Sequence, residues 1–183
     1  MRLADRVVVM ANGTILQADA AACVYDAPSD LFVARFVGSP GMNRIEGEVR
    51  LTGAIPRLHP KPPPTLWGGR ARGPLEGGSG FTLSAESLAE LLPAPPASIG
   101  SGRRLTLGFR PESLSLDPLS TLRGRIEFDE YLGVARCLHF TTPVGTLIAR
   151  VAPDVRLARG IEVGLAIDVA RLSWFDESGK RLA

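Results

Sequence analysis

Acidic side chains gather in one short stretch of the sequence, at Glu127, Asp129 and Glu130. Neighbouring carboxylates can act as acid and base when their environments separate their pKa values. This stretch, however, ends a strand-like run and leads directly into a turn. Charged side chains in such a place are usually solvated. We therefore interpret the cluster as an exposed strand end and expect no catalysis there.

Other catalytic motifs are missing from the sequence. A phosphate-binding P-loop ends in Gly-Lys-[Ser/Thr], but the only Gly-Lys pair, Gly179-Lys180, is followed by Arg181. There is no Gly-x-Ser-x-Gly elbow. The histidines and cysteines stand apart, without the spacing of a zinc site, at His59, His139, Cys23 and Cys137. We expect no enzyme activity, no cofactor and no metal in this chain.

The segment Gly108-Phe109-Arg110-Pro111-Glu112 places two opposite charges at the end of a strand. A proline disfavours helical backbone at the residue before it, so Arg110 should leave the strand in an extended conformation. Glu112 lies close enough in sequence to fold back as a partner of Arg110. The segment could equally be a plain strand exit, and the sequence leaves both interpretations open.

Composition limits the classes of function. The 183 residues hold one domain, or one domain and part of another. Lys and Arg number 21 against 19 Asp and Glu, a balance that argues against nucleic acid as an obligate partner. No stretch approaches the roughly eighteen apolar residues of a membrane span, and the first residues do not resemble a secretory leader. We expect a cytoplasmic protein without direct membrane insertion.

The first residues predict a β-hairpin. Val7 to Met10 form an unbroken apolar run, which is typical of a strand covered on both faces. Asn12-Gly13 suits a two-residue turn that requires positive φ. Two strands alone cannot cover both of their faces. The hairpin should therefore complete a larger domain or pack poorly.

Two short helices should follow the hairpin. The first covers Ala20 to Tyr25, where Asp19 is the available cap. Ser29 can cap the second, with Asp30 beside its positive end. A linker at residues 38–44 should follow, because a Gly and a Pro end the helical pattern. The apolar face of the second helix, which we expect in the core, consists of Phe32, Val33, Phe36 and Val37.

From residue 45 onward, short strands separated by turns indicate a small β-barrel. The candidate strands are Ile45 to Leu51, Arg104 to Arg110, Arg123 to Asp129, Val134 to Phe140, Thr146 to Val151 and Val163 to Ala170. A Pro- and Gly-rich insertion at residues 56–80 and a brief helix at 84–92 interrupt them. We interpret the insertion as a surface excursion, with a polyproline ligand at residues 60–64 as the alternative.

Several motifs, taken in order, resemble the C-terminal portion of the ATP-binding subunits of bacterial ABC importers. Residues 1–15 resemble the last strands of the nucleotide-binding domain, residues 25–34 its connecting helices, and residues 38–43 the junction into the regulatory domain. Four motifs resemble the transport-associated OB domain: Gly108-Phe109-Arg110-Pro111-Glu112, Tyr131-Leu132-Gly133, Phe175-Asp176 and Gly179-Lys180-Arg181. The resemblance covers nearly the whole chain.

The resemblance implies a mainly β fold. It predicts an OB-like small β-barrel regulatory domain at residues 45–183, preceded by a linker at 38–44 and by a hairpin and short helices at 1–37 that resemble a remnant of a P-loop nucleotide-binding domain. In the family, ATP and Mg bind through motifs that would precede Met1. Asp19-Ala20-Ala21 departs from the family's usual Gly-Thr-Pro, so the start of the first helix is less well specified.

The resemblance also implies a regulatory and dimerisation role in the ATP-driven import of sugars or related solutes, at the inner face of the cell membrane. Its implied partners are a second copy of the subunit, as a homodimer, and the membrane permease subunits. Contacts are expected on the barrel, where the candidate interface residues are Arg110, Glu112, Tyr131, Gly133, Phe175 and Asp176.

Two other classes of function stay open as alternatives. The barrel could bind a small ligand or an oxyanion through main-chain amides at Ser101-Gly102 or Gly145-Thr146, although no convergent polar cluster marks a pocket. Nucleic-acid binding would need a basic groove with stacking aromatics. Aromatic residues make up only 6% of the sequence, which argues against it.

Overall fold

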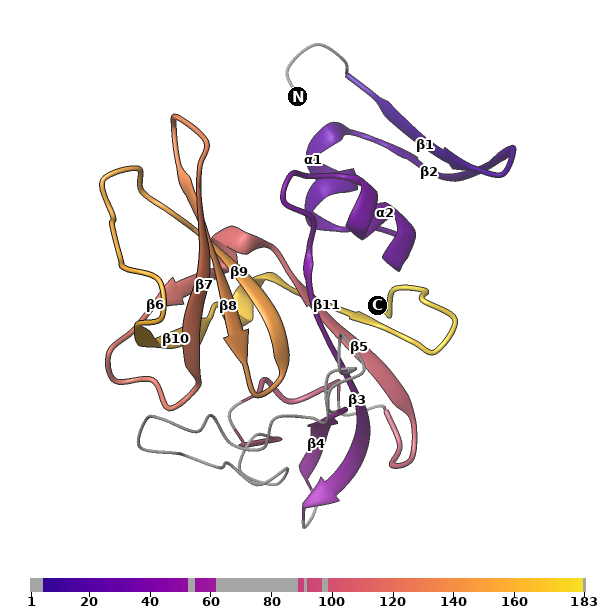
Figure 1. Cartoon of the computed structure of the whole chain (residues 1–183). Helices are drawn as coiled ribbons and strands as arrows, with labels where there is room; N and C mark the ends of the chain where they lie inside the picture. Colours follow the sequence, from indigo (N-terminus) through magenta and orange to yellow (C-terminus); the bar gives the residue numbers. More distant parts are fainter. Residues whose placement is uncertain (1–4, 53–54, 62–88, 91, 97–98, 183) are drawn as a thin grey trace, which may run out of the picture.

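The computed structural model describes residues 5–52, 55–61, 89–90, 92–96 and 99–182. These residues form a hairpin, two short helices and two larger β-sheets, with the helices between the hairpin and the sheets (Figure 1). The predicted mainly β fold is confirmed. Within these ranges, no helix has the length and apolar character needed to cross a membrane.

Strands β1 (Val7–Ala11) and β2 (Thr14–Asp19) form the predicted hairpin. Asn12 and Gly13 have φ values of 50° and 76°, the positive values that the two-residue turn requires. This hairpin and the two helices that follow it are called the N-terminal unit below.

The hairpin is covered on one face only among the described residues. Val9 is 3% exposed and packs on the helices, whereas Val8 and Met10 on the other face are 50% and 55% exposed. One face thus stays open in the described residues, in line with the expectation that two strands alone cannot cover both of their faces. The apolar run alternates between a packed and an open side, as it must in a two-stranded sheet with one neighbouring layer.

Helices α1 (Ala21–Asp26) and α2 (Leu31–Phe36) confirm the two predicted helices. Asp30 caps α2, because its carboxylate accepts a hydrogen bond from the Val33 amide at 2.9 Å. Ser29, the predicted cap, instead uses its main-chain and side-chain donors on strand β2.

The apolar face predicted for α2 divides into two halves. Val33 and Val37 are buried as expected, but Phe32 and Phe36 are 46% and 71% exposed. Their rings stack on each other with centroids 5.9 Å apart. A helix of six residues turns one side to its neighbours, and here that side carries the smaller valine and alanine side chains.

The remaining strands form two antiparallel sheets, ordered β11-β5-β3-β4 and β6-β10-β7-β8-β9. Strands β6 and β9, the edges of the five-stranded sheet, contact each other, so this sheet curls into a small barrel. The strands are β3 (Asn43–Thr52), β4 (Ile55–Pro60), β5 (Arg104–Phe109), β6 (Leu114–Leu116), β7 (Arg123–Tyr131), β8 (Arg136–Thr142), β9 (Gly145–Val151), β10 (Glu162–Ile167) and β11 (Leu172–Phe175). Single 3-10 turns, η1 (Pro111–Ser113) and η2 (Val169–Arg171), precede β6 and β11.

All six predicted strands are present, and β4, β6 and β11 were not predicted. Residues 56–60 of the predicted insertion belong to β4, which pairs with β3, so the insertion begins too early in the prediction. The prolines made this segment look like a loop, but β4 is an edge strand, and edge strands tolerate proline. The rest of the insertion from residue 62, and most of the helix expected at 84–92, lie outside the described residues. The domain boundaries at residues 37 and 45 stay a prediction.

Three groups of buried apolar side chains are found in the described part of the chain. The largest fills the space between the two sheets and includes Leu58, Leu107, Phe109, Phe140, Leu147 and Leu165. A smaller group holds the N-terminal unit and consists of Val9, Val24, Val33 and Val37. Where this unit meets the sheets, the group found among the described residues is small: Ala34, Met42 and Phe175 are buried, and the partly buried Leu31 packs against them. Because so little apolar surface joins the two parts, polar contacts must contribute to the junction.

The pairing of β10 with β6 gives a test of the fold. A Cβ atom at Gly164 in β10 would overlap the main-chain carbonyl oxygen of Asp117, whereas a Cβ at Gly100 would meet open space. We expect Gly164→Ala to lower the free energy of unfolding by about 1–3 kcal/mol, the usual cost of overpacking. Urea denaturation measures this loss, with Gly100→Ala as the matched control. Equal stability of the two variants would contradict the close approach of β10 to Asp117.

Candidate functional site

Arg110 stands between β5 and η1, where Pro111 ends the strand. Its backbone is extended, with φ −73° and ψ 154°, as the following proline predicts. The side chain is buried: the residue is 4% exposed, which is rare for an arginine. A buried guanidinium needs acceptors for its N–H groups, and these come from the N-terminal unit.

The Arg110 guanidinium donates hydrogen bonds to three main-chain carbonyl oxygens. Nε and Nη2 both donate to the oxygen of Tyr25, Nε at 3.0 Å. Nη1 donates to the oxygens of Ala34 at 2.9 Å and Val37 at 2.6 Å. These carbonyls lie at the C-terminal ends of α1 and α2, where helices carry partial negative charge. One side chain thus fastens both helices to the barrel.

Tyr25 links Arg110 to Glu112. The guanidinium carbon lies 4.0 Å from the centroid of the Tyr25 ring, and the Tyr25 hydroxyl donates to Glu112 Oε1 at 2.8 Å. Glu112 therefore acts on Tyr25, and no ion pair within the described ranges joins it directly to Arg110. Burial, followed by the hydrogen bond to Glu112, raises the pKa of Tyr25 to about 12.

Asp176 shapes a turn after β11. Its Oδ1 accepts hydrogen bonds from the amides of Ser178 and Lys180, both at 2.9 Å, and from the Ser178 hydroxyl at 2.7 Å. These bonds, the Ser178 hydroxyl first, hold the pKa of Asp176 below its usual value. The predicted site residue Asp176 thus has a structural task in this turn.

The same turn contacts the start of α2. The Leu31 amide donates to the carbonyl oxygen of Gly179 at 2.9 Å, and Lys180 Nζ lies 3.2 Å from Asp30 Oδ2. This is a second attachment of the N-terminal unit, at the start of α2, whereas Arg110 binds carbonyls at its C-terminal end.

Phe175 lies inside this junction. It is fully buried and packs in one group with Ala34 and Met42. The structure therefore gives its ring an internal role, where no second chain can reach it. Arg110, Glu112, Phe175 and Asp176 all contribute to the junction, either directly or through a neighbouring residue.

Tyr131 and Gly133 lie elsewhere, at the tip of the β7–β8 hairpin. Gly133 has a φ of 81° in the turn, and Tyr131 is 61% exposed beneath the guanidinium of Arg136, which lies 5.0 Å from its ring centroid. Leu132 and Val134 beside them are 39% and 80% exposed. The tip is therefore an open apolar surface.

The acidic side chains of β7 lie beside basic side chains of neighbouring segments. Glu127 pairs with Arg159 at 3.9 Å, and the partly buried Asp129 pairs with Arg136 at 2.6 Å. Glu130 Oε2 lies 3.7 Å from His139 Nε2.

The amides considered for an oxyanion have other neighbours. The Gly102 amide donates to the carbonyl oxygen of Val49 at 2.8 Å, and Gly145 and Thr146 pair with residues 141–142 in the β8–β9 ladder. The Gly102 amide is therefore already used within the protein.

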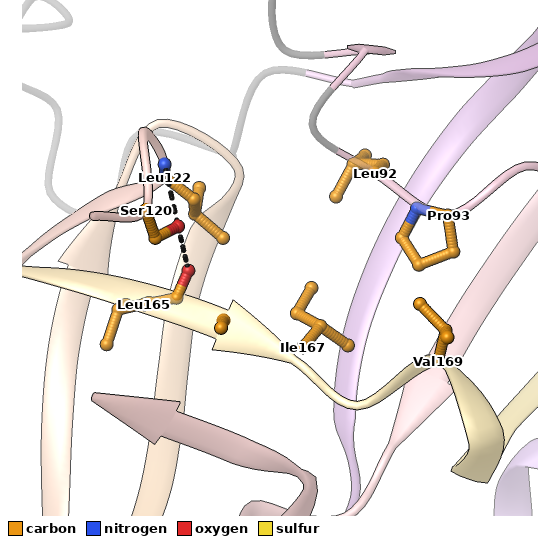
Figure 2. A pocket seen from close by; sticks show the side chains of 8 residues that line it. Leu92, Pro93, Ser120, Leu122, Leu165, Ile167 and Val169 are labelled. Carbon is orange, nitrogen blue, oxygen red and sulfur yellow. Dashed lines mark hydrogen bonds between the residues drawn. The ribbon is translucent and has the colours of Figure 1, made fainter. Parts of the chain in front are cut away.

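An apolar cavity of about 310 Å³ opens beside β10 (Figure 2). Leu92, Pro93, Ile167 and Val169 line it. Ser120 is the polar side chain in its lining, and its hydroxyl is satisfied, because it donates to the carbonyl oxygen of Leu165 and accepts from the Leu122 amide. Among the described lining residues, no free side-chain polar group would orient a ligand, so the cavity offers apolar contact.

Part of the chain matches a known domain family. Residues 107–175 match the family model of the TOBE domain. The chain thus contains a TOBE-like region. This region starts in β5, ends with β11 and contains Arg110, Glu112, Tyr131, Gly133 and Phe175.

Curated relatives match nearly the whole chain. It is 31% identical to the alpha-glucoside transport ATP-binding protein AglK of Rhizobium meliloti over 98% of this chain and 44% of AglK. It is 32% identical to the sn-glycerol-3-phosphate import ATP-binding protein UgpC of Burkholderia ambifaria over 99% of this chain and 45% of UgpC. These matches confirm the predicted resemblance to ABC importer ATP-binding subunits. The chain spans less than half the length of these relatives.

Among solved structures, the cytoplasmic molybdate-binding protein ModG, with molybdate bound, is similar at 15% sequence identity and a TM-score of 0.44. The match covers 72% of this chain and 94% of that one.

Sequence reasoning identified Arg110 and missed its partners. Tyr25 carried no chemical signal in its own segment, and main-chain carbonyls carry none in any sequence. The one usable sign in the sequence was the position of Arg110, directly after the apolar strand residue Phe109 and before Pro111. An arginine buried at such a position needs hydrogen-bond acceptors for its N–H groups.

Replacing Arg110 tests the junction. Arg110→Lys keeps the charge, but one ammonium group cannot replace the fork that reaches three carbonyls. Each buried carbonyl left without a donor costs about 1–3 kcal/mol, so we expect the free energy of unfolding to fall by about 3 kcal/mol or more. Urea denaturation measures the change. Arg159→Lys, at a side chain that is 81% exposed, should change stability little. If Arg110→Lys left the free energy of unfolding unchanged, the role given to this side chain would be refuted.

Tyr25 predicts a dependence on alkaline pH. Its pKa is about 12 in the folded state against 10.0 ordinarily, so the stability that the neutral phenol contributes is complete below pH 10 and is lost as pH rises through 12. We expect the free energy of unfolding to fall more steeply between pH 10 and 12 in the unsubstituted chain than in Tyr25→Phe. Denaturant titrations at several pH values measure both slopes. Identical slopes would contradict the raised pKa.

Proposed function

We propose that this chain acts as the regulatory and dimerisation part of the ATP-binding subunit of an ABC-type importer for sugars or related solutes. One observation carries the proposal: near-complete coverage of the chain by importer ATP-binding proteins, at 31–32% identity. The TOBE-like region lies within that match. The chemistry of ATP and Mg belongs, on this proposal, to the part of those longer relatives that this chain does not match.

The junction supports a mechanical role. The N-terminal unit resembles the end of a nucleotide-binding domain, and Arg110 ties both of its helices to the barrel through neutral main-chain atoms. Hydrogen bonds to carbonyls restrain position regardless of which side chains those residues carry. If the two helices moved, these hydrogen bonds would make the barrel move with them.

The β7–β8 hairpin supports self-association. Its exposed apolar residues are Phe128, Tyr131, Leu132 and Val134. A register shift between Ile126 and Phe128 coincides with the outward placement of the Phe128 ring, which is 56% exposed. Large apolar and aromatic side chains on one protruding element are the kind that form the centre of an interface. We assign this hairpin to contact with a second copy of the chain.

On this proposal the protein works in the cytoplasm, at the inner face of the cell membrane. Its partners are the second ATP-binding subunit and the membrane permease subunits. It enters no bilayer itself and binds no nucleic acid. The candidate residues then have two roles. Four of them stabilise the junction: Arg110, Glu112, Phe175 and Asp176. The other two, Tyr131 and Gly133, form the tip of the β7–β8 hairpin that contacts the second copy.

Sedimentation velocity tests the self-association. We expect a monomer–dimer equilibrium, and we expect Val134→Ser and Phe128→Ser to weaken it about tenfold each, because each removes one interface contact worth about 1.4 kcal/mol. Leu119→Ser is the control, since Leu119 is 91% exposed on a loop outside the hairpin. A strict monomer at high concentration, or an equal effect of Leu119→Ser, would count against the hairpin as the dimer contact.

A further inference from the structure

A second cavity, of about 300 Å³, lies where the N-terminal unit meets the barrel. It is bounded by α1, η1, η2 and the last residues of the described chain. The charged and hydroxyl side chains in its lining are Asp26, Arg110, Glu112, Ser113, Arg171 and Arg181. Hydrogen bonds hold its walls: the Asp168 amide donates to the Ser113 carbonyl oxygen at 2.8 Å, and the Arg181 amide to that of Ser29 at 3.0 Å.

Positive charge prevails in this cavity. Three arginines and two carboxylates line it, which leaves one net positive charge. Arg110 already donates hydrogen bonds to main-chain carbonyls, and Glu112 already accepts a hydrogen bond from the Tyr25 hydroxyl. Arg171 and Arg181 take part in none of the ion pairs found among the described residues. Their guanidinium groups are available to a ligand.

Ser113 adds an unused hydroxyl. The residue is 3% exposed, and its Oγ has no hydrogen-bond partner in the described part of the chain. Burying a hydroxyl without a partner is unfavourable, so such a group calls for an explanation. A ligand in the cavity that Ser113 lines would supply the missing partner.

We propose that this cavity binds a small oxyanion of the phosphate class. Guanidinium groups match phosphate oxygens with paired, charge-assisted hydrogen bonds, and the Ser113 hydroxyl can donate another. The carboxylates of Asp26 and Glu112 limit the charge that the site accepts, so it favours one compact phosphate group over a polyphosphate. The volume corresponds to the smallest ordinary ligand sites.

The cavity lies between the N-terminal unit and the barrel, so a bound ligand would touch both. Asp26 ends α1 in the N-terminal unit, whereas Ser113 and Arg171 belong to the barrel. A phosphate held between these parts would add contacts that exist only while the junction is closed. Binding would therefore stabilise the junction. This inference rests on the cavity alone and does not depend on the transport role.

Titration calorimetry of the whole 183-residue chain with inorganic phosphate tests the site. We expect saturable binding, competition by sulfate and no competition by chloride at equal ionic strength. Pyrophosphate should bind no more tightly than phosphate. Arg171→Gln and Arg181→Gln should each weaken phosphate binding at least about tenfold, because each removes a charge-assisted contact. Arg159→Gln, at an exposed arginine outside the cavity, should leave the affinity unchanged.

Ser113→Ala separates binding from folding. It should weaken phosphate binding while leaving the Tm of the free chain unchanged or higher, because the variant removes a hydroxyl without a partner. The proposal is overturned if phosphate gives no binding heat up to the order of 10 mM, well above the range of specific sites. It is also overturned if Arg159→Gln weakens binding as much as Arg171→Gln does.

Discussion

The buried guanidinium of Arg110 is the interaction on which the arrangement of this chain depends. Burial lowers the pKa of Arg110, yet a guanidinium stays charged in proteins, so its N–H groups must find acceptors. Three carbonyls at the ends of α1 and α2 provide them. The charge therefore dictates where both helices stand against the barrel.

The N-terminal unit has little else to hold it in place. A two-stranded hairpin and two helices of six residues are each too small to be stable alone. In the described part of the chain, the apolar group at the junction has three buried residues, with Leu31 packed against them. Polar attachment therefore decides whether the unit stays on the barrel, and the turn shaped by Asp176 provides the second point. This is also why the cavity between the two parts is a natural place for a ligand to act.

The sequence predicted what depends on local pattern. The Asn12-Gly13 turn, the two helices and six strands follow from turn residues and from the spacing of apolar side chains. Strand β4 was missed because its prolines resemble a loop, although an edge strand can carry them. The partners of Arg110 lie more than 70 residues away along the chain, and no local pattern reports such contacts. The outward direction of Phe32 and Phe36 depends on the packing of Val33 and Val37 against other elements.

The central claim is that Arg110 makes the N-terminal unit and the barrel open as one body. Native-state hydrogen exchange of the whole chain measures it most directly. The account predicts that the Val33 and Val37 amides exchange with the same opening free energy as core amides of β8, and that Arg110→Lys lowers the value for the helices alone. Helices that open far more easily than β8 in the unsubstituted chain would contradict the claim.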